Sequence, residues 1–212
     1  MSLLTHRRAL LTAKGINKLP YEYQQVEYLE STGTQYIDTE FIPHHYPIMQ
    51  VEYQAVSIPA PGERQSLFGS SIEKSSRFLL SYNGASLTGI GDGFSTKNHN
   101  LCRDKKRHIC VINTKTLTIY IDDILAVNAN EFLNDNNFTV LLFAFNRSGV
   151  ATGMSKTKIF FAKCWNDDTL VRDFIPCYRK ADNEAGLYDL VNGKFYTNKG
   201  TGEFILGNGI AN

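Results

Sequence analysis

The sequence predicts an all-β protein in which two antiparallel sheets pack face to face as a β-sandwich. From Pro20 onward, about a dozen short segments alternate apolar and polar residues, and turn-forming residues separate them. After the first eighteen residues, no stretch has the apolar period of a long helix. The chain also holds 13 Phe and 11 Tyr, residue types that favour strands. Many short strands without long helices are typical of one antiparallel sandwich.

Residues 1–18 are expected to form an N-terminal arm, and residues 19–212 the sandwich. The apolar residues of the arm recur seven positions apart, which favours a short amphipathic helix. An isolated helix shorter than about 12–15 residues is marginal in water, so the arm is expected to gain order by docking to a partner protein. A frayed terminus is the alternative. The expected assembly contacts are Leu3, Leu4, Arg7, Arg8, Leu10 and Leu11.

The strands of the first half follow in order along the chain. Each expected strand has alternating or continuous apolar residues and is bounded by Gly, Pro, Ser or Asn. The expected segments are residues 25–29, 35–38, 48–57, 66–70, 77–82, 86–90 and 107–113.

A hairpin is predicted where residues 116–121 reach the turn Asp122-Asp123. Aspartate is enriched in the left-handed backbone region that a tight turn requires. Residues 128–137 form a polar connection, for which one helical turn is expected. Residues 138–146 are nearly continuously apolar, which predicts a central strand covered on both sides. Residues 156–166 and 170–178 are expected to complete the sheets.

A second hairpin is predicted from residues 186–191 and 194–197. Asn192-Gly193 lies between them, and this dipeptide accepts positive φ at both positions of a two-residue turn. That register places Leu190 opposite Phe195. The last short strand is expected over residues 203–206.

Two long segments near opposite ends of the chain carry a family resemblance. Residues 19–43, LPYEYQQVEYLESTGTQYIDTEFIP, and residues 170–204, LVRDFIPCYRKADNEAGLYDLVNGKFYTNKGTGEF, resemble the two ends of a family of phage and prophage virion proteins from gut bacteria. The resemblance implies a concanavalin A-like, or laminin-G-like, jelly-roll sandwich whose first and last strands lie together. It also implies a virion location, with assembly in the cytoplasm of the bacterial host.

Composition favours neither a nucleic-acid partner nor a membrane partner. The net charge is +1, from 22 basic and 21 acidic residues. No segment approaches the roughly 20 apolar residues of a membrane span. Cys102, Cys110, Cys164 and Cys177 have neither C-x-x-C nor metal-site spacing, so reduced thiols are expected. A disulfide between Cys102 and Cys110 remains an alternative.

The sequence holds no recognisable catalytic set, and an enzyme is not expected. Glycosidases on this type of sandwich need two acids on one strand face. Neither Glu27 with Glu30 nor the adjacent Asp122 and Asp123 meets that requirement. The pair His44-His45 lacks a third ligand nearby and is interpreted as a loop, so no metal or cofactor is expected.

Two hypotheses from different functional classes follow. The first is a non-enzymatic virion structural protein, a head-fibre, decoration, tail or baseplate component that is anchored through the arm. It would associate with other virion proteins and form homo-oligomers. The alternative is a carbohydrate-binding module that recognises glycans on the host surface, because sandwich loops hold sugars by a stacked aromatic ring and a few polar groups. The aromatic candidates for that role are Tyr82, Phe94 and Trp165.

Overall fold

A computed structural model describes residues 18–60, 62–72, 76–83, 86–95, 104–133 and 136–210. Over these residues the chain forms nineteen strands and no helix. The arm contacts expected from Leu3 to Leu11, and Cys102, lie outside this part of the chain.

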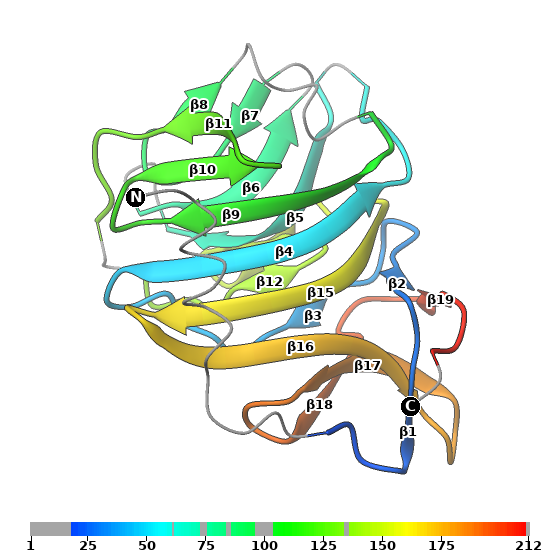
Figure 1. Ribbon diagram of the computed structural model, residues 1–212. Helices are drawn as coiled ribbons and strands as arrows, with labels where there is room; N and C mark the ends of the chain where they lie inside the picture. Colours follow the sequence, from blue (N-terminus) through cyan, green and yellow to red (C-terminus); the bar gives the residue numbers. More distant parts are fainter. Residues whose placement is uncertain are drawn as a thin grey trace.

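Two sheets contain the strands (Figure 1). The larger sheet holds β1 (Tyr23–Gln25), β2 (Leu29–Glu30), β4 (Pro47–Ala55), β9 (Arg107–Asn113), β10 (Thr118–Ile121), β11 (Ile124–Asn128), β15 (Thr157–Asn166), β16 (Thr169–Arg179), β17 (Glu184–Asp189), β18 (Lys194–Thr197) and β19 (Ile205–Leu206). The smaller sheet holds β3 (Ile37–Asp38), β5 (Arg64–Ser71), β6 (Phe78–Asn83), β7 (Ser86–Thr88), β8 (Phe94–Ser95), β12 (Leu141–Leu142), β13 (Phe145–Arg147) and β14 (Val150–Thr152).

The order of the strands confirms the predicted sandwich. The main path of the larger sheet is β11-β10-β9-β4-β15-β16-β17-β18, and that of the smaller sheet is β14-β13-β5-β6-β7-β8. The described strand pairs are antiparallel except β13 with β5, which run parallel. The fold is therefore an all-β, two-sheet sandwich, as the alternating segments predicted.

The core lies between the two sheets. Along β4 the alternate residues Met49, Val51 and Tyr53 are fully buried, because successive side chains of a strand point to opposite faces. They belong to one apolar cluster with residues of the smaller sheet, among them Phe68 and Leu80. Burial of alternating side chains from both sheets is what holds the two layers together.

Segments from the two ends of the chain lie side by side, although the last strand, β19, pairs with β2 and the first strand, β1, pairs with β16. In β19, Ile205 pairs with Glu30 of β2, and an isolated bridge joins Val26 to Gly209. The two segments that carry the resemblance meet in the larger sheet, where Tyr23 of β1 pairs with Arg179 of β16, whereas β3 of the first segment belongs to the smaller sheet (Figure 1).

The hairpin at Asp122-Asp123 is confirmed. Ile121 pairs with Ile124, and the two aspartates between them have φ values of 49° and 66°. These values correspond to the two-residue turn whose twist matches that of its flanking strands. The carboxylate of Asp122 also accepts a hydrogen bond from the backbone N–H of Ile109 at 2.9 Å, so the turn is tied to β9.

The C-terminal hairpin exists, but the predicted register was wrong by two residues. Asp189 pairs with Lys194, so residues 190–193 form a longer loop and Phe195 lies opposite Tyr188 instead of Leu190. Of the predicted turn pair, Gly193 alone has positive φ, at 65°. The physical reason is the buried Asp189 carboxylate, which accepts hydrogen bonds from the Val191 N–H and the Asn192 amide and so closes the wider loop.

The central strand predicted over residues 138–146 is broken. Residues 140–146 are all buried, as expected. However, the segment forms two short strands, β12 and β13, instead of one, and Phe143 between them has φ 66°. Its N–H donates to the Leu67 carbonyl and its carbonyl accepts from Ser155, so backbone contacts outside the ladder cause the break. The helical turn expected in residues 128–137 is absent from the described part of that connection.

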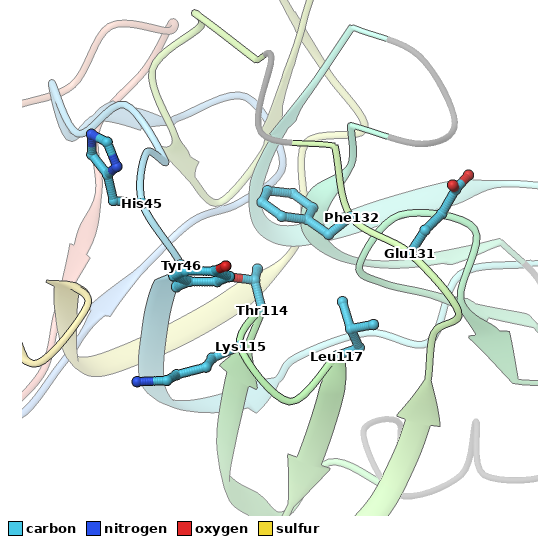
Figure 2. A pocket seen from close by; sticks show the side chains of 7 residues that line it. All are labelled: His45, Tyr46, Thr114, Lys115, Leu117, Glu131 and Phe132. Atoms are coloured by element: carbon cyan, nitrogen blue, oxygen red, sulfur yellow. The ribbon is translucent and has the colours of Figure 1, made fainter.

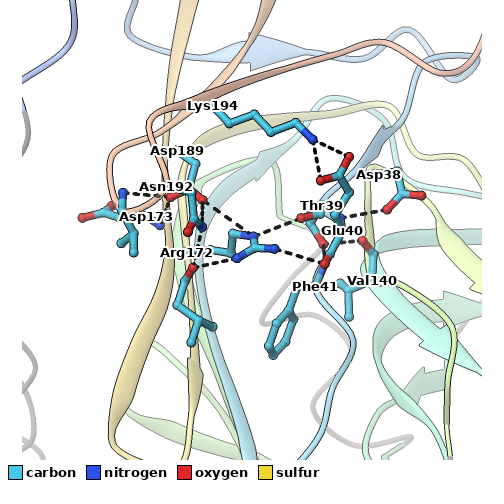
Figure 3. Close-up of polar contacts among 12 residues, drawn as sticks. Asp38, Thr39, Glu40, Phe41, Val140, Arg172, Asp173, Asp189, Asn192 and Lys194 are labelled. Atoms are coloured by element: carbon cyan, nitrogen blue, oxygen red, sulfur yellow. Dashed lines mark hydrogen bonds and ion pairs between the residues drawn. The ribbon is translucent and has the colours of Figure 1, made fainter.

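An ionic junction ties the N-terminal and C-terminal segments together, with the buried Asp189 carboxylate at one side and the exposed Glu40–Lys194 pair at the other (Figure 3). The Arg172 guanidinium donates to the backbone carbonyls of Thr39 at 3.1 Å and Glu40 at 3.0 Å, and its Nε lies 3.6 Å from Asp189 Oδ2. Lys194 reaches the Glu40 carboxylate at 2.6 Å, and that hydrogen bond lowers the pKa of Glu40. The junction therefore links β16, the β17–β18 hairpin and the segment after β3.

Candidate functional site

The structure does not support two of the three aromatic residues proposed for stacking on a sugar. The side chains of Tyr82 and Trp165 belong to the core, with exposed fractions of 0% and 2%. Neither ring has a face open to a ligand, because both side chains are buried. Phe94 belongs to β8, and its side chain lies outside the described part of the structure.

A hollow of about 530 Å³ opens instead at one end of the sandwich, where three connections of the larger sheet meet (Figure 2). One connection precedes β4, the second joins β9 to β10, and the third follows β11. The lining residues are His45, Tyr46, Thr114, Lys115, Leu117, Glu131 and Phe132.

Tyr46 contributes the exposed aromatic ring of this hollow. Its side chain is 56% exposed, and its backbone has φ 48°, immediately after His45 with φ 50°. Positive φ is an outlier for a bulky residue, and Pro47 follows directly, which further restricts the residue before it. Strain of this kind costs about 1–3 kcal/mol per residue. Tyr46 is therefore held in an unusual backbone conformation at the rim of an open hollow.

Hydrogen bonds hold the segment on either side of Tyr46. The Asp167 N–H donates to the His45 carbonyl at 3.0 Å. The Thr114 hydroxyl donates to the Pro47 carbonyl at 3.0 Å, and the Thr114 N–H donates to the same oxygen at 3.3 Å. Thr114 directly follows β9 and Asp167 directly follows β15, the two neighbours of β4, so the sheet holds the backbone on both sides of Tyr46.

The β9–β10 connection places a cation beside the ring. Asn113 Oδ1 accepts the backbone N–H groups of Lys115 at 2.9 Å and Thr116 at 3.3 Å, a side-chain turn typical of asparagine. Leu117 then reverses the chain with φ 57°. This turn leaves Lys115 exposed and half-buries Leu117.

The connection after β11 completes the opposite wall. The half-buried Phe132 ring lies 6.4 Å from the ring of Phe78, and the Ala129 N–H donates to the Leu117 carbonyl at 2.8 Å. Glu131 is exposed beside Phe132. In Figure 2, Lys115 and Glu131 extend outward on opposite sides of the hollow. The site thus combines aromatic and aliphatic walls with single charges of opposite sign at its rim.

The lining of the hollow provides apolar surface and a few polar groups, among them the imidazole of His45. Glu131 is the single carboxylate among the lining residues, whereas hydrolysis of a glycosidic bond uses a pair. In the part of the chain that the structure describes, no group of three or more His, Cys, Asp or Glu residues could hold a metal ion. The described residues form no helix, and so none that is long and apolar enough to cross a membrane.

The three described cysteines, Cys110, Cys164 and Cys177, are fully buried. Burial raises the pKa of Cys164 and raises that of Cys177 to about 12. A thiol that keeps its proton at neutral pH is a poor nucleophile, so these residues pack in the core.

Sequence reasoning missed the lining of this hollow. His45 was interpreted only as part of the loop pair His44-His45, and the connection that contains Phe132 was interpreted as polar. Two signals were present: an aromatic residue directly before the proline that opens a strand, and the apolar pair Phe132-Leu133 inside a polar connection. Neither signal indicates by itself that the two segments meet.

The sequence matches no protein family model and no curated protein. Among solved structures, it is similar to the CBM40 of the Ruminococcus gnavus IT-sialidase, with 15% identity, TM-score 0.46, and coverage of 68% of this chain and 91% of the other. The same module bound to α2,3 sialyllactose gives TM-score 0.47 at 15% identity and the same coverage. The K499G mutant of the NanB sialidase from Streptococcus pneumoniae gives TM-score 0.43 and 13% identity, covering 87% of this chain but 38% of the sialidase.

Proposed function

We propose that the chain is a non-catalytic carbohydrate-binding module and that the hollow around Tyr46 is its glycan site. The observation that carries this proposal is the exposed Tyr46 ring, fixed at the mouth of a hollow of about 530 Å³. Ligand sites typically enclose about 300–1,000 Å³ and combine apolar walls with a few polar groups. An aromatic ring with one open face offers a flat apolar surface to the C–H face of a sugar.

The rim supplies the polar half of such a site. Lys115 can donate to sugar hydroxyls, Glu131 can accept from them, and His45 can do either. All three side chains are exposed, so they remain hydrated until a ligand arrives. Charges of opposite sign on opposite sides favour a ligand that is rich in hydroxyl groups over one that carries a large net charge.

A glycan array tests the proposal directly. The full chain would be screened against host-surface and bacterial cell-wall glycans, and hits would be measured by calorimetry with wild type and Tyr46→Ala. Loss of the stacked ring is expected to weaken binding about tenfold, since such contacts contribute about 0.5–1.5 kcal/mol beyond the area that they bury. Tyr21→Ala is the matched control, because Tyr21 is 87% exposed and does not line the hollow. Absence of binding across the array, or equal binding by Tyr46→Ala, would refute the glycan site.

The second candidate function is a structural component of a phage virion, at the head fibre, tail or baseplate. Its support is the sequence resemblance of residues 19–43 and 170–204, together with the contact of these two segments through Arg172 and Glu40. In this proposal residues 1–18 anchor the sandwich to other virion proteins, and copies of the chain associate with one another. The two functions are compatible, since a displayed sandwich could also bind host glycans.

Deletion of residues 1–18 tests the virion proposal. The shortened chain is expected to keep the thermal unfolding of the sandwich and to lose incorporation into particles. A truncated protein that is incorporated at the normal level would rule out the anchoring role of the arm.

A further inference from the structure

The unusual backbone conformation of Tyr46 extends to its neighbours. His45 and Tyr46 are consecutive left-handed residues with φ 50° and 48°, and Pro47 follows them. A proline disfavours helical backbone conformations in the residue before it, and bulky L-residues rarely adopt positive φ. Asp167, which donates to the His45 carbonyl, also has φ 51°. Three left-handed residues other than glycine therefore meet at one junction.

Burial does not account for this conformation. Both His45 and Tyr46 are exposed, so neither side chain gains the apolar burial that usually offsets backbone strain. Glycine would adopt the same backbone at less cost. Elsewhere the chain uses glycine at some positions of positive φ, such as Gly193, and small polar residues at others, such as Asn183, whereas Tyr46 is a bulky aromatic residue. The strained backbone thus includes His45 and Tyr46, two of the residues that line the hollow.

We propose that the left-handed His45-Tyr46 pair preforms the binding hollow, with His45 as the positioning residue for the Tyr46 ring. This inference rests on the proposed glycan function and adds a mechanism to it. The pair turns the chain so that the Tyr46 ring lies at the mouth of the hollow before a ligand arrives. A sugar ring then binds without having to order the loop, and preorganisation of this kind raises affinity. The backbone strain lowers the stability of the fold, and the Tyr46 ring is already oriented for stacking as a result.

The substitution His45→Gly tests the proposal in the full chain. Glycine relieves the strain at position 45 but leaves the preceding loop free to adopt other conformations. The melting temperature is expected to rise by about 2–4 °C. The dissociation constant for an array-identified glycan is expected to increase about fivefold, because an affinity gained from preorganisation is lost when the loop is free. Amide hydrogen exchange at Asp167, whose N–H binds the His45 carbonyl, is expected to accelerate.

Two matched variants separate positioning from stability. Asp123→Gly relieves another left-handed, exposed residue, with φ 66°, in the turn at the far end of β10. It is expected to raise the melting temperature with no change in glycan affinity. His45→Asn keeps a polar residue that tolerates the left-handed region, and it is expected to bind the glycan more tightly than His45→Gly and to keep wild-type hydrogen exchange at Asp167.

Each outcome decides a different part of the proposal. A melting temperature that does not rise in His45→Gly would overturn the claim of strain. A rise with unchanged affinity, or with unchanged exchange at Asp167, would overturn the positioning role. A third outcome is that wild type binds no glycan, while His45→Gly has a higher melting temperature and faster hydrogen exchange at Asp167. This outcome would confirm that the junction is strained. The glycan function, and with it the role of the junction in sugar binding, would then be refuted.

Discussion

The substitution Asp189→Ala is expected to destabilise the sandwich by about 3–5 kcal/mol. Asp189 is fully buried, and its carboxylate accepts hydrogen bonds from the N–H of Asp173 at 2.9 Å, the N–H of Val191 at 3.0 Å and the amide of Asn192 at 2.6 Å. Alanine leaves these three donors without that acceptor, but Val191 and Asn192 are exposed and can bind water instead, so the cost per donor lies at or below the lower end of the range of about 1–3 kcal/mol for buried groups. It also removes the partner of Arg172, and breaking a buried ion pair costs about 3–5 kcal/mol. Because the donors share one carboxylate, the two estimates overlap and do not add.

Urea unfolding followed by fluorescence of the buried Trp165 would measure this loss. For a chain of this length the melting temperature should fall by roughly 10 °C, with little change in the denaturant slope. Asp189→Asn keeps one acceptor oxygen and is expected to lie between wild type and alanine. Asp182→Ala, which breaks the exposed pair with Arg179, is the control and should leave the unfolding midpoint unchanged. A loss below about 1 kcal/mol in Asp189→Ala would show that the junction does not hold the two ends of the chain together.

Two further predictions concern the turn after β10 and alkaline pH. Asp123→Gly should stabilise the protein by about 1 kcal/mol by relieving positive φ. Asp122→Gly should destabilise it despite the same φ sign, because Ile109 loses its hydrogen-bond acceptor; equal urea midpoints would contradict this. Burial raises the pKa of both Cys177 and Tyr196 to about 12, from ordinary values of 9.0 and 10.0. The folded state therefore keeps protons that the unfolded chain releases, so stability is complete below pH 9 and decreases as pH rises toward 12. Melting temperatures from pH 7 to 11 should show this decrease, and Tyr196→Phe should reduce its slope; a flat profile would contradict it.

Elements with a local signal were predictable from the sequence. The strand at residues 107–113 has the predicted bounds in the structure, because a short run of apolar residues, residues 109–112, lies within the segment and polar residues flank it. The turn at Asp122-Asp123 was predictable for the same reason, since two adjacent residues contain all the chemistry that it needs. A large apolar core was also predictable, because many of the predicted strands alternate apolar and polar residues.

Features that depend on distant contacts were not predictable. The register of the C-terminal hairpin follows from the buried Asp189 carboxylate, and its burial depends on Arg172 of the neighbouring strand and on the packing around both. The pattern around Tyr82 and Trp165 did not decide between an exposed ring and a core ring, because aromatic residues occupy both faces of a sheet.

The sequence by itself determined the class of the protein: alternating apolar residues at short intervals require two sheets that bury one face each. Only the tertiary structure decided where a ligand could bind. Tyr46, Lys115 and Phe132 belong to separate connections, and they line one hollow because β4, β9 and β10 are neighbours in the sheet and β11 ends beside them. The order of strands in a sheet is set by the packing of the whole chain, so no single segment contains that information.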